Sequence, residues 1–342
     1  MQNTLPIIAV VTRETRLAGL KARYTTKAAA AFRMQQAIGH EVALRRERMA
    51  KMGVASKVID EAVALDEVAQ LADDREYESE DEVYQRNVKR LVAELDFGHP
   101  VKQIDRSFLP NFDFGRCVLV VVVGQDGLVA NTAKYVGDLP IVAVNPDPSR
   151  NDGVLLPFRI DEARRAVHRV LERKFRERKI TLAQVNLNDG QRMLAFNDFF
   201  VGCASHVSAR YTIETDQQLE SQSSSGVLVS TGAGSTGWLS SLFNMTDGFC
   251  RFAGMPEPQP VTIQWEERRL IWAVREPFRS KHSSVGLVTG FLDEGHELVI
   301  GSQMPTSGVI FSDGVESDYL EFGSGTIARF TVAKQRARLV VG

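Results

Sequence analysis

The segment Gly124–Gly127, with the sequence GQDG, combines two glycines with a carboxylate directly after the apolar run CVLVVVV. A glycine-containing loop lets phosphate oxygens approach backbone N–H groups, and a carboxylate there can accept a proton from a hydroxyl group or help to hold Mg²⁺. Such turns also follow strands for steric reasons alone, so the flanking elements must decide between the two interpretations. Asp126 is the candidate for acid–base chemistry.

A second polar pair, Asn197 and Asp198, stands between the apolar residues Phe196 and Phe199. The asparagine amide donates and accepts hydrogen bonds, whereas the aspartate carboxylate only accepts them. Such a pair suits the hydroxyl and amide groups of a nucleotide, and it equally suits an ordinary β-bend. The residue types alone leave both interpretations open.

The segment Ser230–Trp238 (STGAGSTGW) joins a predicted strand, GVLVS, to a predicted helix that begins near Trp238. Small residues allow a ligand to approach the backbone, and a hydroxyl group or a helix N-terminus can bind its polar edge. A flexible linker would rarely open a helix with a large aromatic residue, so we favour a binding loop.

Four other features favour a structural role. Val274–Pro277 (VREP) predicts a strand end with a surface ion pair, and Ser312–Gly314 (SDG) predicts a hairpin turn. The basic stretch Thr12–Lys27 predicts a solvated loop and a helix start, with an electropositive wall beside a phosphate site as the alternative. The six histidines show no metal-ligand spacing, so no metal held by protein side chains alone is expected.

The elements around GQDG predict a largely parallel α/β domain. Pro6–Val11, Cys117–Val123 and Leu139–Val144 are apolar runs without polar alternation, as in strands buried on both faces. A short helix over 128–135 between the last two strands predicts a right-handed βαβ crossover. Because open α/β sheets bind ligands beyond the carboxyl ends of their strands, this context favours a functional GQDG loop. The loop Asn145–Pro148 is expected at the same edge.

Helices complete the N-terminal half. We predict a helix over Ala28–Ile38, one or two helices within 41–79, a helix that begins at a capping box formed by Ser79 and Glu82, and a helix from Asp161 to about Arg176. After Lys179 the pattern changes to short alternating segments separated by turn residues, which predicts an all-β domain, most simply a sandwich. The expected domains are residues 1–158 and 159–342.

Composition limits the class of protein. The chain has 342 residues, 44% hydrophobic and 25% charged, with a formal net charge of −2. These values are typical of a globular protein and offer no basic field for nucleic acid, and no stretch is long and apolar enough for a membrane span. The three cysteines are widely spaced, which predicts neither disulfides nor a metal knuckle and fits the cytoplasm.

Taken together, these segments resemble the NAD kinase family over most of the chain and in the family's order. The family's Gly-Gly-Asp-Gly loop is similar to Gly124–Gly127, its Asn-Glu pair to Asn197 and Asp198, and its Thr-Pro-x-Gly-Ser-Thr-Ala-Tyr segment to Thr231–Trp238. The stretches TRETRLAGLKARY, VNPDPSRNDG, SSSGVLVSTGAGS and AVREPF resemble the mitochondrial-type branch of that family.

The resemblance implies an α/β N-terminal domain, a β-sandwich-like C-terminal domain that carries the dinucleotide site, and a homodimer or higher homo-oligomer. It also implies ATP- and Mg²⁺-dependent phosphorylation of NAD at the 2′-hydroxyl of the adenosine ribose, which gives NADP. Asp126 would be the base or orienting carboxylate, and Gly124, Gln125 and Gly127 would lie at the ATP phosphates. The NAD-binding residues would be Asn197, Asp198, Thr231, Ser235, Thr236 and Trp238, with the indole in place of the family's tyrosine.

Four positions depart from the family's pattern: Gln125 replaces a glycine, Asp198 a glutamate, Gly232 a proline, and Ser225 an aspartate found in many relatives. If residue 125 had a positive φ, its side chain would introduce strain. A nucleotide-binding protein with weakened catalysis, and a kinase of the same fold that acts on a sugar or lipid hydroxyl, are therefore the alternatives.

Overall fold

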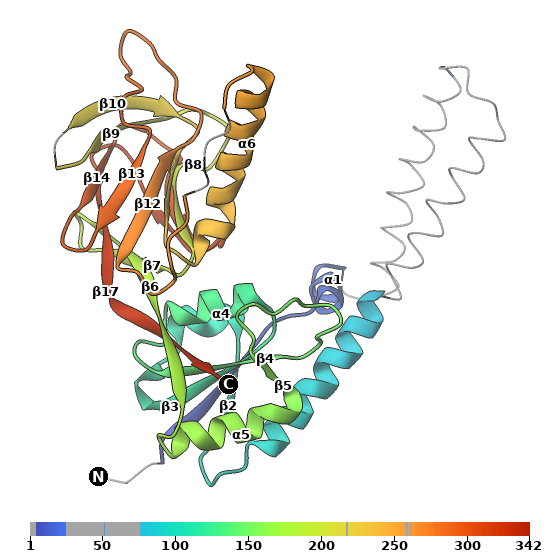
Figure 1. The fold of residues 1–342 in the computed structure, drawn as a ribbon. Coiled ribbons are helices and arrows are strands. Elements are labelled where there is room, and N and C mark those ends of the chain that lie inside the picture. Colours follow the sequence, from blue (N-terminus) through green and yellow to red (C-terminus); the bar gives the residue numbers. More distant parts are fainter. Residues whose placement is uncertain (1–4, 25–50, 52–75, 217, 257–258, 260) are drawn as a thin grey trace.

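The chain folds around two β-sheets in the computed structural model (Figure 1). The structure describes residues 5–24, 51, 76–216, 218–256, 259 and 261–342. The predicted helix Ala28–Ile38 and nearly all of the segment 41–79 lie outside these residues. No helix in the described part combines the length and apolar character that crossing a bilayer requires.

The N-terminal half contains four parallel strands in the spatial order β2-β1-β3-β4, of which β1, β3 and β4 are the apolar runs predicted above. Their bounds are β1 Ile7–Thr12, β2 Val101–Asp105, β3 Cys117–Val123 and β4 Pro140–Asn145, and the short β5, Phe158–Arg159, pairs with β4. Every residue of β4 is buried, and so is every residue of β3 except Val118. The unbroken apolar runs therefore correspond to strands covered on both faces.

Helices cover both faces of the parallel strands. On one face Ile8, Val10 and Val121 pack against α5 (Ile160–Leu171) and the helix over residues 76–94. On the other face the alternate residues, such as Ala9 and Val120, pack against α4 (Asp126–Ala133). Figure 1 shows α4 and α5 on opposite sides of these strands. A further helix, α1 (Arg16–Tyr24), follows β1.

Two helix starts differ from the prediction. Ser79 lies inside the helix over 76–94, so the predicted capping box does not begin that helix. Helix α5 has Arg159 as its N-cap and Asp161 as its second residue, and it ends at Leu171 before Arg173, whose φ of 58° is left-handed. Local capping signals therefore located both helices and misplaced their ends.

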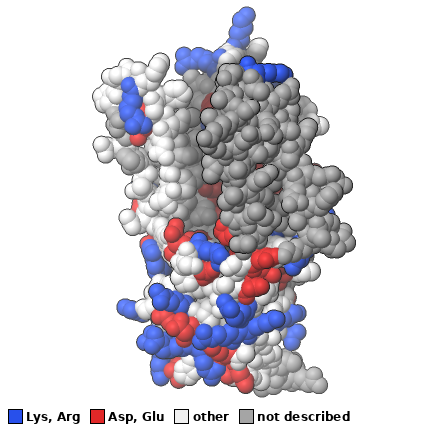
Figure 2. Space-filling view, turned by 90° about the vertical axis from the view of Figure 1, so that its right-hand side faces the viewer, with Lys and Arg blue, Asp and Glu red and all other residues white. Residues whose placement is uncertain are grey.

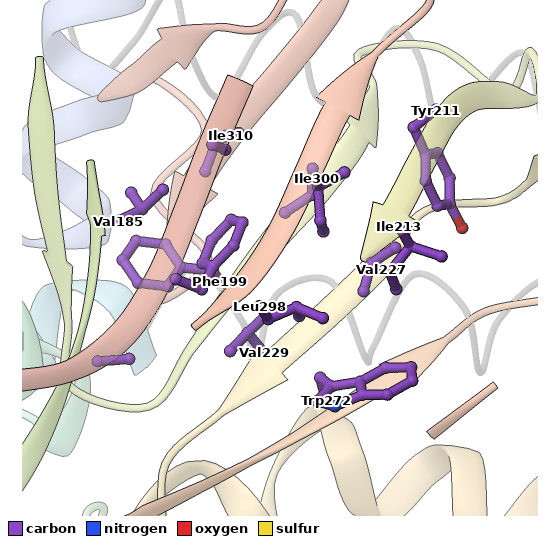
Figure 3. Close-up of a cluster of buried hydrophobic side chains, with 14 of the residues drawn as sticks. Val185, Phe199, Tyr211, Ile213, Val227, Val229, Trp272, Leu298, Ile300 and Ile310 are labelled. Atoms are coloured by element: carbon purple, nitrogen blue, oxygen red, sulfur yellow. The ribbon is translucent and has the colours of Figure 1, made fainter. Parts of the chain in front are cut away.

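The C-terminal half is a sandwich of two sheets. The six-stranded antiparallel sheet has the order β13-β12-β11-β8-β15-β16 and faces β10, β9, β14 and β17 of the larger sheet. Between them lie the side chains labelled in Figure 3, among them Phe199, Tyr211 and Trp272. The bounds are β7 Arg192–Ala195, β8 Asp198–Cys203, β9 Ala209–Glu214, β10 Leu219–Ser224, β11 Val227–Ser230, β12 Arg269–Val274, β13 Thr289–Asp293, β14 Leu298–Ser302, β15 Gly308–Ser312 and β16 Tyr319–Glu321.

Two long strands join the halves. β6 (Arg176–Leu187) and β17 (Ile327–Val341) pair with each other in antiparallel orientation, and the end of β17 pairs in parallel with β4 through Arg338 and Leu339. Figure 1 shows β17 running from the C-terminal sandwich into the N-terminal sheet. The expected class, a largely parallel α/β part plus a β-sandwich part, is confirmed. The boundary at residue 158 stays a prediction, because α5 and the end of β17 both pack on the N-terminal strands.

Candidate functional site

Asp126 is placed by the end of β3 and the start of α4. It is the first residue of α4, and its carboxylate oxygens accept hydrogen bonds from the backbone N–H groups of Leu155 at 2.7 Å and Val154 at 3.3 Å. These N–H groups belong to the loop that follows β4. The prediction that this loop lies at the same sheet edge as GQDG is therefore confirmed.

The GQDG backbone is free of strain. Gln125, the N-cap of α4, has φ −114° and ψ 165°, an extended conformation that any residue adopts, so the condition for strain at this position, a positive φ, is not met. A Cβ on Gly127 would meet no atom within 4 Å, which leaves this backbone open to a ligand. Gly124 is buried, and its N–H donates to the Val144 carbonyl. Of the two glycines, only Gly127 offers an open approach.

The Asn197 and Asp198 pair lies at the start of β8, next to β11. The Asn197 N–H donates to Asp313 at 2.6 Å, and its carbonyl accepts from Thr231 N–H at 2.8 Å. Among the described residues, no hydrogen bond engages either the Asn197 amide group or the Asp198 carboxylate. The main chain of the pair is thus fixed, and both side chains are available to a ligand.

The Thr231–Trp238 loop separates into a structural part and an exposed part. The Thr231 hydroxyl donates to the Phe196 carbonyl at 2.6 Å, the Ser235 hydroxyl donates to the Gly232 carbonyl at 2.7 Å, and both residues are buried. Thr236 is exposed, and Trp238 is the half-buried first residue of α6 (Trp238–Phe252). The buried hydroxyls hold the loop, while Thr236 and Trp238 face outward.

Two glycines of this loop are required by close approach of other backbone. A Cβ on Gly234 would lie 2.2 Å from the Asn197 carbonyl oxygen, and a Cβ on Gly232 would lie 2.2 Å from the Gln264 carbonyl oxygen. No side chain fits at such distances. The close approach of the Gln264 backbone therefore explains why this chain has glycine at position 232, where the family has proline.

A pocket of about 420 Å³ collects most of the predicted site residues from both halves of the chain. Asp126 and Gly127 come from the N-terminal half, and Asn197, Asp198, Thr236 and Trp238 come from the C-terminal half. Gly124, Gln125, Thr231 and Ser235 do not line this pocket. A carboxylate at a glycine loop thus faces an amide, a second carboxylate and an indole across one cavity.

Two solved structures that superpose on this chain are an NADH kinase and an NAD kinase. The crystal structure of yeast NADH kinase complexed with NADH superposes with a TM-score of 0.54 at 16% identity, covering 100% of this chain and 84% of that chain. The structure of an NAD kinase from Archaeoglobus fulgidus in complex with ATP superposes with a TM-score of 0.50 at 18% identity, covering 74% of this chain and 88% of that chain. This chain has the NAD kinase fold. No protein-family model and no curated protein sequence matches it.

In this NAD kinase fold, Asp198 is a carboxyl group with an unusual proton affinity. Its side chain is buried, and burial together with the negative charge of Asp313 raises the pKa of Asp198 to about 7. The group therefore changes charge near neutral pH. When ionised, it is a strong acceptor for ligand hydroxyl or amino groups.

Asp313 is a site residue that the sequence interpretation missed. The SDG segment is a turn, with φ of 55° at Asp313 and 68° at Gly314, as predicted. However, the Asp313 side chain also lines the pocket and accepts hydrogen bonds from the N–H groups of Phe196 and Asn197. A carboxylate in a Gly-containing turn is too common a pattern to have indicated this role.

Arg275 also has a different partner from the one predicted. Its guanidinium lies 5.2 Å from the centre of the Trp238 ring, and Trp238 stacks on Phe200 with ring centroids 5.6 Å apart. Glu276 instead accepts a hydrogen bond from Ser225. The expected surface ion pair within VREP is absent, and Arg275 helps to fix the indole that borders the pocket.

The basic stretch after β1 lies on the other side of Gln125. Arg13 and Arg16 line a separate hollow of about 280 Å³ together with Gln125. Arg13 pairs with Glu80 at 2.6 Å, and Arg16 lies 3.7 Å from the same carboxylate. Their charges are therefore partly neutralised within the protein.

Proposed function

We propose that this protein is a kinase that transfers the γ-phosphoryl group of ATP to the 2′-hydroxyl of the adenosine ribose of NAD, giving NADP. The observation that carries the proposal is the single pocket in which Asp126 and Gly127 face Asn197, Asp198, Thr236 and Trp238. The NAD kinase fold supports the same assignment. Gly124, Gln125, Thr231 and Ser235 belong to the proposed site as residues around this pocket.

Asp126 supplies the acid–base group of this mechanism. Its carboxylate, at the first residue of α4, accepts the hydroxyl proton or orients the hydroxyl group. The open backbone at Gly127 admits phosphate oxygens. Because phosphoryl transfer depends mainly on positioning and charge neutralisation, no covalent nucleophile is needed.

Asn197 and Asp198 hold the acceptor nucleotide. The Asn197 amide can donate to and accept from a base or ribose, and the ionised Asp198 carboxylate accepts from ribose hydroxyl groups. The Trp238 indole borders the ligand, and Phe200 stacks on the indole ring. The side of the pocket that Trp238 forms is therefore already in place when the nucleotide binds.

Mg²⁺ is proposed to arrive with ATP. The described residues contain no group of three or more His, Cys, Asp or Glu side chains that could hold a metal ion. Mg²⁺ bound to substrate phosphates needs only one or two carboxylates, and Asp126 is the carboxylate beside the open glycine backbone. The ion would neutralise phosphate charge.

The direct test is NADP formation by purified protein supplied with ATP, Mg²⁺ and either NAD or NADH. We expect NADP or NADPH, and the ratio of the two rates gives the substrate preference. Absence of product with any phosphate donor would overturn the proposal. Calorimetric NAD binding without turnover, with activity restored by Gln125→Gly, would indicate the binding protein instead, and a panel of sugar and lipid alcohols tests the other alternative.

We also propose that the protein is a homodimer or higher homo-oligomer that associates through α6. Phe249 is 66% exposed and Phe252 is 92% exposed on this helix, of which only Leu239 is buried. In Figure 2 the upper left of the molecule is mostly uncharged, whereas the lower part carries charges of both signs. Light scattering should show that Phe252→Asp lowers the molecular mass, while Phe108→Asp, at another exposed phenylalanine, leaves it unchanged.

The proposal also includes a cellular compartment and a branch of the NAD kinase family. The three cysteines are unpaired, which supports the cytoplasm as the expected location. The resemblance of four segments to the mitochondrial-type branch stays a prediction.

A further inference from the structure

Helix α4 contacts the pocket region from both of its ends. Asp126 is its first residue, and Lys134 is its C-cap. The Lys134 ammonium group donates to the Ser312 hydroxyl at 2.8 Å and lies 3.6 Å from the Asp313 carboxylate. Both charged side chains are only 2% exposed. An eight-residue helix thus carries the proposed catalytic carboxylate at one end and a buried cation at the other.

Asp313 connects Lys134 to Asn197 and Asp198, the two residues proposed to bind the nucleotide. One of its carboxylate oxygens accepts from Asn197 N–H at 2.6 Å and the other accepts from Phe196 N–H at 3.2 Å. Its own N–H donates to the Asp198 carbonyl at 2.9 Å. Three consecutive residues are therefore positioned by one aspartate.

A buried carboxylate in this position needs a compensating charge. Burial is the largest influence on both groups: it raises the pKa of Asp313 and lowers the pKa of Lys134, and the charge of each partner opposes the shift of the other. The other charged groups that act on the pair are Asp198, Asp318 and Arg106. Removing one member of such a pair leaves the other charge uncompensated.

We propose that Lys134 is a positioning residue for the acceptor nucleotide: its ammonium group compensates the Asp313 carboxylate, which holds the Phe196–Asp198 main chain so that Asn197 and Asp198 face the pocket. The acceptor role of this pair rests on the proposed function. The positioning role rests on the contacts alone. Lys134 acts through Asp313 and touches no substrate.

A positioning role for Lys134 predicts a larger effect on the KM for NAD than on kcat. In Lys134→Met the hydrocarbon part of the side chain is kept and the charge is lost, so the Asn197 segment loses its anchor while Asp126 keeps its hydrogen bonds. A misplacement of about 1 Å can cost roughly 100-fold in rate or affinity. We expect the KM for NAD to rise by about tenfold to 100-fold, with a smaller change in kcat and in the KM for ATP.

Two readouts distinguish positioning from a general loss of packing. Lys134→Arg keeps the charge and should restore most of the NAD affinity. Without the Lys134 charge, Asp313 binds a proton more readily and loses its negative charge. Asp198 then faces a neutral group, so the neutral-pH inflection of kcat/KM for NAD should also shift. Lys174→Met is the matched control, since Lys174 is 75% exposed and its ammonium group pairs only with Glu172 among the residues that the structure describes.

Hydrogen exchange tests the same role without substrate turnover. The Phe196 and Asn197 amides should exchange faster in Lys134→Met than in the wild type and in Lys174→Met, whatever the reaction that the protein catalyses. Unchanged exchange, NAD affinity and pH profile in a folded Lys134→Met protein would overturn the proposal. If Lys134→Met does not fold, Lys134→Gln, which keeps an N–H donor but loses the charge that compensates Asp313, must accelerate exchange at these two amides, and unchanged exchange there overturns the proposal. Faster exchange without any NADP formation would overturn only the proposed function.

Discussion

The backbone N–H of Leu155 donates a 2.7 Å hydrogen bond to the carboxylate of Asp126, 29 residues earlier in the chain. The loop after β4 thereby holds a side chain that the end of β3 has placed. One strand end positions the carboxylate and the next strand end orients it. This relationship makes Asp126 a preorganised group, and it leads to the first prediction.

Asp126→Asn should lower the rate of NADP formation by about 10²–10⁴-fold, because an amide cannot accept the hydroxyl proton. The free energy of unfolding should fall by only about 1 kcal/mol, since one of the two N–H donors loses a good acceptor. Steady-state kinetics and urea unfolding measure the two effects. Asp152→Asn, at an exposed aspartate of the same loop, is the control and should change neither.

Gln125→Ser should stabilise the protein by about 0.5–1 kcal/mol. Gln125 is the N-cap of α4, has extended backbone and makes no capping hydrogen bond through its side chain. A serine hydroxyl can accept from an N–H of the first turn, whereas Gln125→Ala cannot and serves as the control. Urea midpoints compare the variants. A gain in Gln125→Ala equal to that in Gln125→Ser would show that capping is not the cause.

Asp198 should make stability fall as pH rises through neutrality. Burial raises its folded-state pKa from the usual 3.8 to about 7, so the folded state holds a proton that the unfolded state has lost between these values. The stabilisation is complete below about pH 4 and lost above about pH 7. The free energy of unfolding of Asp198→Asn, measured relative to that of the wild type, should therefore increase by up to about 4 kcal/mol between pH 4 and pH 8. Urea unfolding at both pH values tests this, and a difference independent of pH would contradict it.

Two glycine-to-alanine changes should have opposite effects on folding. Gly234→Ala would place a Cβ 2.2 Å from the Asn197 carbonyl oxygen, and we expect a loss of about 1–3 kcal/mol together with weaker NAD binding. Gly127→Ala meets no atom within 4 Å and lies in the first turn of α4, so it should stabilise by up to about 1 kcal/mol. It should nevertheless slow the reaction, because the new methyl group occupies the approach to the backbone. Thermal unfolding and kinetics of both variants provide the comparison.

Local sequence signals predicted the elements that hold the site. Buried parallel strands need apolar residues on both faces, so β1, β3 and β4 could be recognised without partners. The helix ends at residues 79 and 161 were misplaced because a capping pattern at one position competes with equivalent turns nearby. Strand ends also predicted that the loops after β3 and β4 would meet at one edge.

Other features needed the folded chain. The side chains of Thr231 and Ser235 looked like ligand contacts, and the structure uses both to hold the loop. Whether Gln125 is strained depends on a φ angle that residue type does not determine. Asp313 looked like a turn residue, which it is, and its second role depends on a segment more than 100 residues earlier.

The strands, the glycine loop with Asp126 and the polar pair could be predicted from the sequence, because each depends on residues close together in the chain. The buried pair of Lys134 and Asp313, 179 positions apart, and its support of Asn197 arise only when the chain folds. Burial is what gives these charges their effect on each other and on Asp198. A local sequence pattern does not indicate which charged side chains become buried when the chain folds.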